Sequence, residues 1–143
     1  MKIFKLSHIG EFHTNHNEDF LISEETGANR KLIAVMDGCS SGNDSHFAST
    51  LIGKLLRKIA KQEAYREYAQ KHKTDLARQL ETVSLQLFEE LSNINRHLDL
   101  RSDEILSTLI LAIVDVEIKN AEILIVGDGL IHIDGQNIEY END

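Results

Sequence analysis

The chain has 143 residues, 41% of them apolar and 27% charged, a composition typical of a soluble globular protein. One domain with one hydrophobic core is expected, since no proline, repeat or low-complexity stretch marks a linker. The formal net charge of −9 disfavours binding to nucleic acid or to an anionic membrane, because those partners require a positive field.

The N-terminus and the cysteine content favour a cytoplasmic location. Residues 1–5 alternate charged and apolar side chains and lack the uninterrupted apolar segment of a signal peptide. No stretch of the chain approaches the length of a membrane span. The single cysteine, Cys39, excludes an internal disulfide, which agrees with a reducing compartment.

The first third of the chain is predicted to form β-strands over residues 2–9, 20–23 and 31–36. The third is a continuous apolar run, consistent with a strand buried on both faces. Gly27, Asn29 and Arg30 predict a turn between the second and third strands.

Two amphipathic helices are predicted next. From Phe47 to residue 61, apolar residues fall in pairs at helical spacing with basic residues between or after them, and Asp44 or Ser45 is a suitable N-cap. Residues 62–73 are polar and are either helical or a connecting segment. Residues 76–98 carry an apolar stripe with alternating steps of three and four. We expect both stripes to pack on one sheet, rather than to form a coiled coil or to bind a partner.

The remainder returns to strand, over residues 105–116, 122–126, 130–134 and 137–140. Lys119-Asn120, residues 127–129 and Asp134-Gly135 predict the turns between them. Strands, then two helices, then strands indicate an α+β layered fold.

Two aspartates stand at strand ends, Asp19 before the strand at 20–23 and Asp37 after the strand at 31–36. If these strands pair as a hairpin, the two carboxylates meet at one end of the sheet. Carboxylates at close range repel each other unless a cation lies between them. Magnesium and manganese prefer such oxygen ligands, so the pair suggests a hydrolytic metal site.

Other kinds of site have less support. Cys39 has Ser45, not arginine, six residues on, so the cysteine phosphatase loop is absent. No GxxxxGK or GxGxxG motif supports nucleotide binding. His13 and His16 lie near Glu18 and Asp19; they are either solvated or hydrogen-bonded histidines, or part of a zinc site that needs a third ligand.

Read in order, these motifs resemble the type 2C family of metal-dependent serine/threonine protein phosphatases over about residues 7–134. The motifs that carry the resemblance, in chain order, are Gly10, Asn17-Glu18-Asp19, Met36-Asp37-Gly38 at a strand end, an amphipathic helix, Ser107-Thr108 in an apolar strand, and Val126-Gly127-Asp128-Gly129.

The resemblance implies a β-sandwich flanked by helices, with two manganese or magnesium ions at one end. In that family the ions bridge a water that attacks phosphorus directly, with no phosphoenzyme intermediate. By resemblance, Asp19, Asp37 and the backbone carbonyl of Gly38 are metal ligands. Asp128 corresponds to an aspartate for which a structural or hydrogen-bonding role is expected. The implied substrates are phosphoserine, phosphothreonine or other phosphate monoesters.

The sequence departs from the family pattern at two places. Thr14 replaces an arginine that binds the substrate phosphate in many members, and His13 beside it is a candidate phosphate contact that carries charge only when protonated. Cys39-Ser40-Ser41-Gly42 replaces the two glycines and the histidine that commonly follow the second motif.

The length also departs from the family, which continues past residues 127–129 through strands that supply at least one more aspartate ligand. Residues 1–143 are therefore expected to be one phosphatase-like domain, incomplete at the C-terminus and truncated after its first half to two-thirds. The parent protein would be a manganese- or magnesium-dependent phosphatase, and this chain alone would be weak or inactive. The alternative is a non-catalytic phosphatase-like binding or regulatory module. Unpaired strand edges predict self-association.

Overall fold

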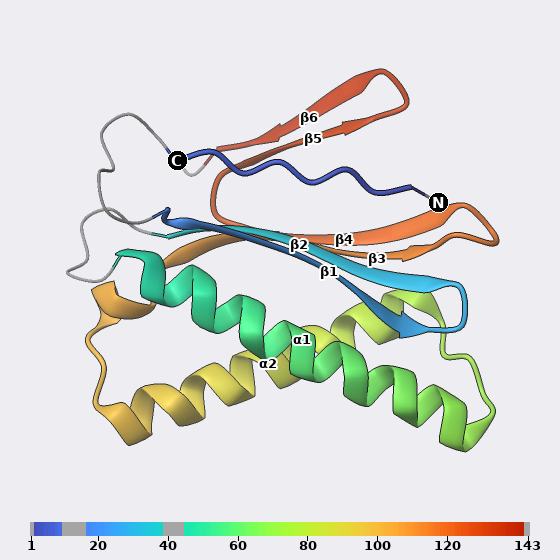
Figure 1. Cartoon of the computed structure of the whole chain (residues 1–143), viewed down its shortest axis with the longest axis horizontal. Helices are drawn as coiled ribbons and strands as arrows, with labels where there is room; N and C mark the ends of the chain where they lie inside the picture. The colour runs from blue at the N-terminus through green and yellow to red at the C-terminus, as the bar shows by residue number, and fades with distance from the viewer. Residues whose placement is uncertain (1, 10–16, 39–44, 142–143) are drawn as a thin grey trace.

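A computed structural model describes residues 2–9, 17–38 and 45–141, and it has an α+β architecture in layers. Four antiparallel strands form one sheet in the order β1-β2-β3-β4, two helices cover one face, and the β5–β6 hairpin lies beyond the other (Figure 1). The elements are β1 (Asp19–Gly27), β2 (Arg30–Gly38), α1 (Ser45–Gln70), α2 (Leu76–Leu98), the short 3-10 helix η1 (Ser102–Ile105), β3 (Ser107–Asp115), β4 (Asn120–Val126), β5 (Gly129–Ile133) and β6 (Gln136–Tyr140).

Most predicted elements are confirmed, some of them with changed bounds. The strands expected at 20–23 and 31–36 are each nine residues long, because the ladder continues through their polar ends. The polar stretch after residue 61 is helical to Gln70. The strand expected from residue 105 begins at Ser107, after η1. Of the two proposed N-caps, Asp44 lies outside the described residues and Ser45 is the first residue of α1.

Two predictions about strands are wrong. Residues 2–9 form no strand, and the side chains of Phe4 and Leu6 are 90% and 88% exposed. Their alternating pattern suits a strand, but a strand also needs an edge to pair with. β2 is not buried on both faces either: buried residues alternate with more exposed ones, and Val35 on the outer face is 50% exposed.

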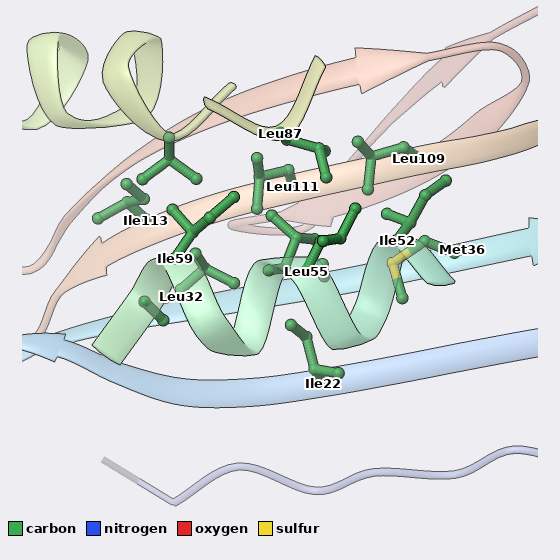
Figure 2. Packing of buried hydrophobic residues seen from close by; sticks show 14 of the residues in the cluster. Ile22, Leu32, Met36, Ile52, Leu55, Ile59, Leu87, Leu109, Leu111 and Ile113 are labelled. Carbon is green, nitrogen blue, oxygen red and sulfur yellow. The ribbon is translucent and has the colours of Figure 1, made fainter. Parts of the chain in front are cut away.

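The hydrophobic core lies between the inner face of the sheet and the two helices. Figure 2 shows Ile22, Leu32 and Met36 from β1 and β2 packed with helical side chains. Leu109, Leu111 and Ile113 from β3 pack in the same cluster. The helical residues labelled there are Ile52, Leu55, Ile59 and Leu87. Both helices thus pack on the same sheet, as predicted. Neither described helix combines the length and apolar character needed to cross a membrane.

The outer face of the sheet carries several apolar side chains and is only partly covered, with Val35 50% exposed. The β5–β6 hairpin lies over the β4 side, where Ile123 and Ile125 line a hollow with Ile131 and Ile138. β5 approaches β3 so closely that a Cβ at Gly129 would lie 2.8 Å from Cδ1 of Ile110. The hairpin turn falls at Asp134 and Gly135, both with positive φ, as the sequence predicts.

Helix α1 packs closely on β1 because Gly53 has no side chain. A Cβ there would lie 2.3 Å from Cδ1 of the Phe20 ring. The ring itself packs against the buried core, and the Arg57 guanidinium carbon stands 5.4 Å from its centroid. The glycine therefore fixes how near the helix lies to the sheet.

A buried ion pair holds the end of the sheet that is remote from Asp19 and Asp37. Arg30 and Asp115 are paired across β2 and β3, and Nε of Arg30 donates to Oδ2 of Asp115 at 3.2 Å. Nη1 of Arg30 also donates to the Thr74 carbonyl and to Oε1 of Gln79. These bonds join the sheet to the segment that begins α2.

The pKa of Asp115 is held well below its usual range, first by a hydrogen bond from Lys73, whose Nζ lies 2.7 Å from Oδ2. Arg30 and the backbone N–H groups of Ile118 and Glu117 act in the same direction. Burial of the carboxylate opposes them. The bonds outweigh the burial, so Asp115 is charged at neutral pH.

We expect Gly53→Ala to destabilise the protein. The substitution gains about 1 kcal/mol of helix propensity, but overpacking a core contact costs about 1–3 kcal/mol, so the steric cost outweighs the gain. Urea unfolding measures the net change, with the exposed substitution Lys54→Ala as control. A Gly53→Ala variant more stable than the wild type would contradict this packing.

We also expect the Asp115 carboxylate to contribute to acid sensitivity. Its folded-state pKa is lowered, so its stabilisation is present at neutral pH and is lost as pH falls below about 4. Asp115→Asn should lower the melting temperature at pH 7 and reduce its further fall between about pH 5 and pH 2. The exposed variant Asp99→Asn should follow the wild-type profile. An Asp115→Asn profile parallel to the wild type would show that the carboxylate does not carry this effect.

Candidate metal centre

Asp19 and Asp37 lie directly opposite each other where β1 begins and β2 ends. Residues paired in this way project to the same face of the sheet, with Cβ atoms typically about 4.5–5.5 Å apart. That face is the outer one, because Ile22 and Met36 occupy the inner, helix-covered face. Both aspartates are exposed. The hairpin predicted to bring them together is therefore confirmed, while their role as ligands stays a prediction.

The register that brings the aspartates together is set at the other end of the hairpin. The pairing shifts between Glu25 and Gly27, and Asn29 takes a positive φ of 60° in the turn. Ala28 in this turn donates its N–H to Oε1 of Glu67 on α1 at 2.7 Å. A slip of one residue would send one aspartate to the opposite face, so this anchored turn maintains the pair.

Residues from two other motifs that resemble the phosphatase family lie at the same end of the sheet. Thr108 on β3 is paired with Asp37, and Gly127 lies beside Thr108: a Cβ on Gly127 would be 3.1 Å from Cγ2 of Thr108. Gly127 has a φ of +80°, a conformation that favours glycine. Asp128 is the next residue, in the turn between β4 and β5. Asp37, Thr108 and Gly127, which are distant in sequence, thus lie at the same end of the sheet.

Gly38 is buried, and its backbone is hydrogen-bonded to the start of β1. Its N–H donates to the carbonyl of Glu18 at 3.2 Å. The same carbonyl accepts a 2.5 Å bond from Oγ of Ser49 on α1. Oγ of Ser107 has two carbonyl acceptors within reach, that of Asp37 at 2.9 Å and that of Thr108 at 2.8 Å.

The sequence alone indicates no specific role for either of these serines. Ser107 is part of a motif, and Ser49 stands among the apolar residues of the first helix. A serine on the apolar side of an amphipathic helix is a signal for a buried hydrogen bond, since a buried hydroxyl needs a partner.

Several predicted residues fall outside the described part of the chain. His13, the candidate phosphate contact, and Thr14, His16 and Cys39 all lie there.

The chemistry of the facing aspartates fits a hard divalent cation. Magnesium is commonly held by one or two carboxylates together with waters, and manganese accepts the same oxygen ligands. Within residues 2–9, 17–38 and 45–141, no group of three or more His, Cys, Asp or Glu side chains is placed to hold a metal ion. At this end of the sheet the described residues bring the Asp19 and Asp37 carboxylates opposite each other.

Comparisons with known proteins give a family and similar solved structures. The family model for protein phosphatase 2C matches residues 8–142. A structure of the PP2C phosphatase domain and a fragment of the regulatory domain of the cell fate determinant SpoIIE from Bacillus subtilis is 26% identical, with a TM-score of 0.59. It is matched over 96% of this chain and 36% of its own.

A second structure, the SpoIIE phosphatase domain from Bacillus subtilis in a crystal form without domain swapping, is 27% identical with a TM-score of 0.45. It is matched over 96% of this chain and 51% of its own. No curated protein matches the chain. The chain thus spans about a third to a half of the solved structures that it resembles.

Proposed function

Because this chain belongs to the protein phosphatase 2C family, we propose that it forms part of a metal-dependent phosphatase domain that hydrolyses phosphoserine, phosphothreonine or other phosphate monoesters. The observation that carries the proposal is the placement of Asp19 opposite Asp37 on the outer face at one end of the sheet. A pair of facing carboxylates is the feature of this fold best suited to hold a hard cation.

In this proposal Asp19, Asp37 and the carbonyl of Gly38 are ligands of manganese or magnesium. A chain with a net charge of −9 that handles phosphate esters needs local positive charge, which a bound cation provides. When bound, such ions polarise phosphoryl oxygens and activate water for attack on phosphorus. The chain's own part is to hold two carboxylates at a fixed spacing. His13 remains a proposed phosphate contact.

We propose further that residues 1–143 hold only part of a single phosphatase-like domain. The chain spans 36% of the phosphatase structure with the higher TM-score, and the described residues supply two carboxylates. The outer face of the sheet also carries exposed apolar surface, with Val35 50% exposed. Further strands of the longer protein would cover this face and complete the ligand set.

A second candidate function is a non-catalytic phosphatase-like module that binds a partner or senses a signal. It is favoured by the absence of a third metal-binding side chain beside the aspartates among the described residues, and by Thr14 in place of the phosphate-binding arginine. Metal binding distinguishes the two candidates, since this module has no need of a cation.

We expect residues 1–143 to bind Mn²⁺ weakly and to hydrolyse an aryl phosphate little or not at all. Asp37→Asn should weaken Mn²⁺ binding at least about tenfold in calorimetric titration, because it removes a charged ligand. Asp134→Asn, an exposed position in the hairpin turn, should leave binding unchanged.

Other results of the Mn²⁺ titration and of the activity assay would distinguish the alternatives. Unchanged binding in Asp37→Asn would contradict the ligand assignment, and no binding by the wild type would favour the non-catalytic module. Robust Mn²⁺-dependent turnover that Asp37→Asn abolishes would show that residues 1–143 are sufficient for catalysis.

We also expect residues 1–143 to self-associate, since β1 and β4 form the edges of the described four-stranded sheet and Val35 is exposed on its outer face. Val35→Glu should reduce the associated fraction in light scattering over a range of concentrations, because it charges this face. Leu85→Glu, at a 63% exposed position on α2, should not. A strictly monomeric wild type, or an equal effect of both variants, would count against association through this face.

A further inference from the structure

The peptide unit that joins Asp37 to Gly38 is hydrogen-bonded on both of its sides. Its carbonyl lies 2.9 Å from Oγ of Ser107 on β3, and the same hydroxyl also reaches the Thr108 carbonyl at 2.8 Å. Its N–H donates to the Glu18 carbonyl on the β1 side, at 3.2 Å. This unit lies between the two groups of β2 proposed as metal ligands, the Asp37 carboxylate and the Gly38 carbonyl, so its orientation affects both.

Helix α1 extends this chain of hydrogen bonds through Ser49. The Ser49 side chain is completely buried, and its hydroxyl has one hydrogen to donate. Two carbonyls lie within reach, that of Glu18 at 2.5 Å and that of His46 at 3.1 Å. The shorter bond leads to Glu18, which also accepts the Gly38 N–H. One connected series of bonds therefore runs from β3 through β2 and Glu18, the residue before β1, to α1.

Glycine is the residue that most needs such bonds. Without a Cβ, Gly38 lets the backbone approach a ligand closely, but it also permits more backbone conformations than any other residue. A glycine carbonyl that binds a cation must be held in one orientation for binding to be strong, because disorder in the free protein weakens affinity. The bonds from Ser107 and through Glu18 restrict the rotation of the peptide unit that precedes this carbonyl.

We propose that Ser49 and Ser107 are positioning residues that hold the Asp37–Gly38 peptide in the conformation required for metal binding. The inference rests on the proposed function, because it takes Asp37 and Gly38 to be ligands. Neither serine is itself a ligand: each acts by donating a hydrogen bond to a backbone carbonyl. Ser49 also makes the metal site dependent on the position of α1.

Two NMR readouts test this in residues 1–143. The first is the hydrogen-exchange rate of the Gly38 amide, which shows, without any metal, how firmly the Asp37–Gly38 peptide is held. The second is the Mn²⁺ concentration that half-broadens the amide signals of Asp19 and Asp37, which detects weak binding. The test variants are Ser49→Ala and Ser107→Ala, and urea unfolding of each shows that it folds.

Two further variants serve as controls. Ser107→Thr keeps the hydroxyl at a half-buried strand position and should restore both readouts. Ser84→Ala removes another buried helical hydroxyl, one that donates to Leu80 within its own helix at 2.7 Å, and should change neither readout.

We expect each test variant to speed Gly38 exchange about tenfold and to require about ten times more Mn²⁺, since each loses one hydrogen bond to a backbone carbonyl. If exchange rises while the Mn²⁺ requirement is unchanged, the positioning role is wrong and the proposed function stands. If neither readout changes, the two serines do not hold the Asp37–Gly38 peptide in place. If the wild type shows no broadening at Asp19 and Asp37, both the ligand assignment and this inference are overturned.

Discussion

The pairing register of β1 with β2 is the constraint on which the rest of the structure depends. Side chains alternate between the two faces of a strand, so the register decides which side chains are buried in the core and which lie on the outer face. It places Ile22 and Met36 in the core against the helices and Asp19 opposite Asp37 on the outer face. The stability of the fold and the geometry of the proposed site are therefore set together.

Carboxylates lie at both ends of the sheet. At one end, Asp115 is buried and receives Lys73 and Arg30, so the chain itself supplies compensating cations. At the other end, two exposed aspartates face each other across the β1–β2 hairpin. The proposed divalent cation would bind between these two carboxylates. Family membership and electrostatics thus lead to the same expectation.

Local periodicity predicted most of the fold. The apolar stripe of residues 76–98 matches α2, and the apolar runs and turn residues located both hairpins. The strand at 2–9 failed, because alternation shows which residues could form a strand but not whether a pairing edge exists. The Arg30–Asp115 pair and the Ser49 bond were missed, since they join residues 85 and 31 positions apart. The opposed aspartates were found because a hairpin is a short-range feature.

We propose that Asp19 and Asp37 together bind a divalent cation. A crystal structure of the protein grown with Mn²⁺, with anomalous diffraction recorded to locate the metal, tests this proposal. We expect an anomalous peak in contact with both carboxylates and the Gly38 carbonyl. A well-ordered hairpin with Asp19 and Asp37 opposed and no metal between them at saturating Mn²⁺ would contradict it.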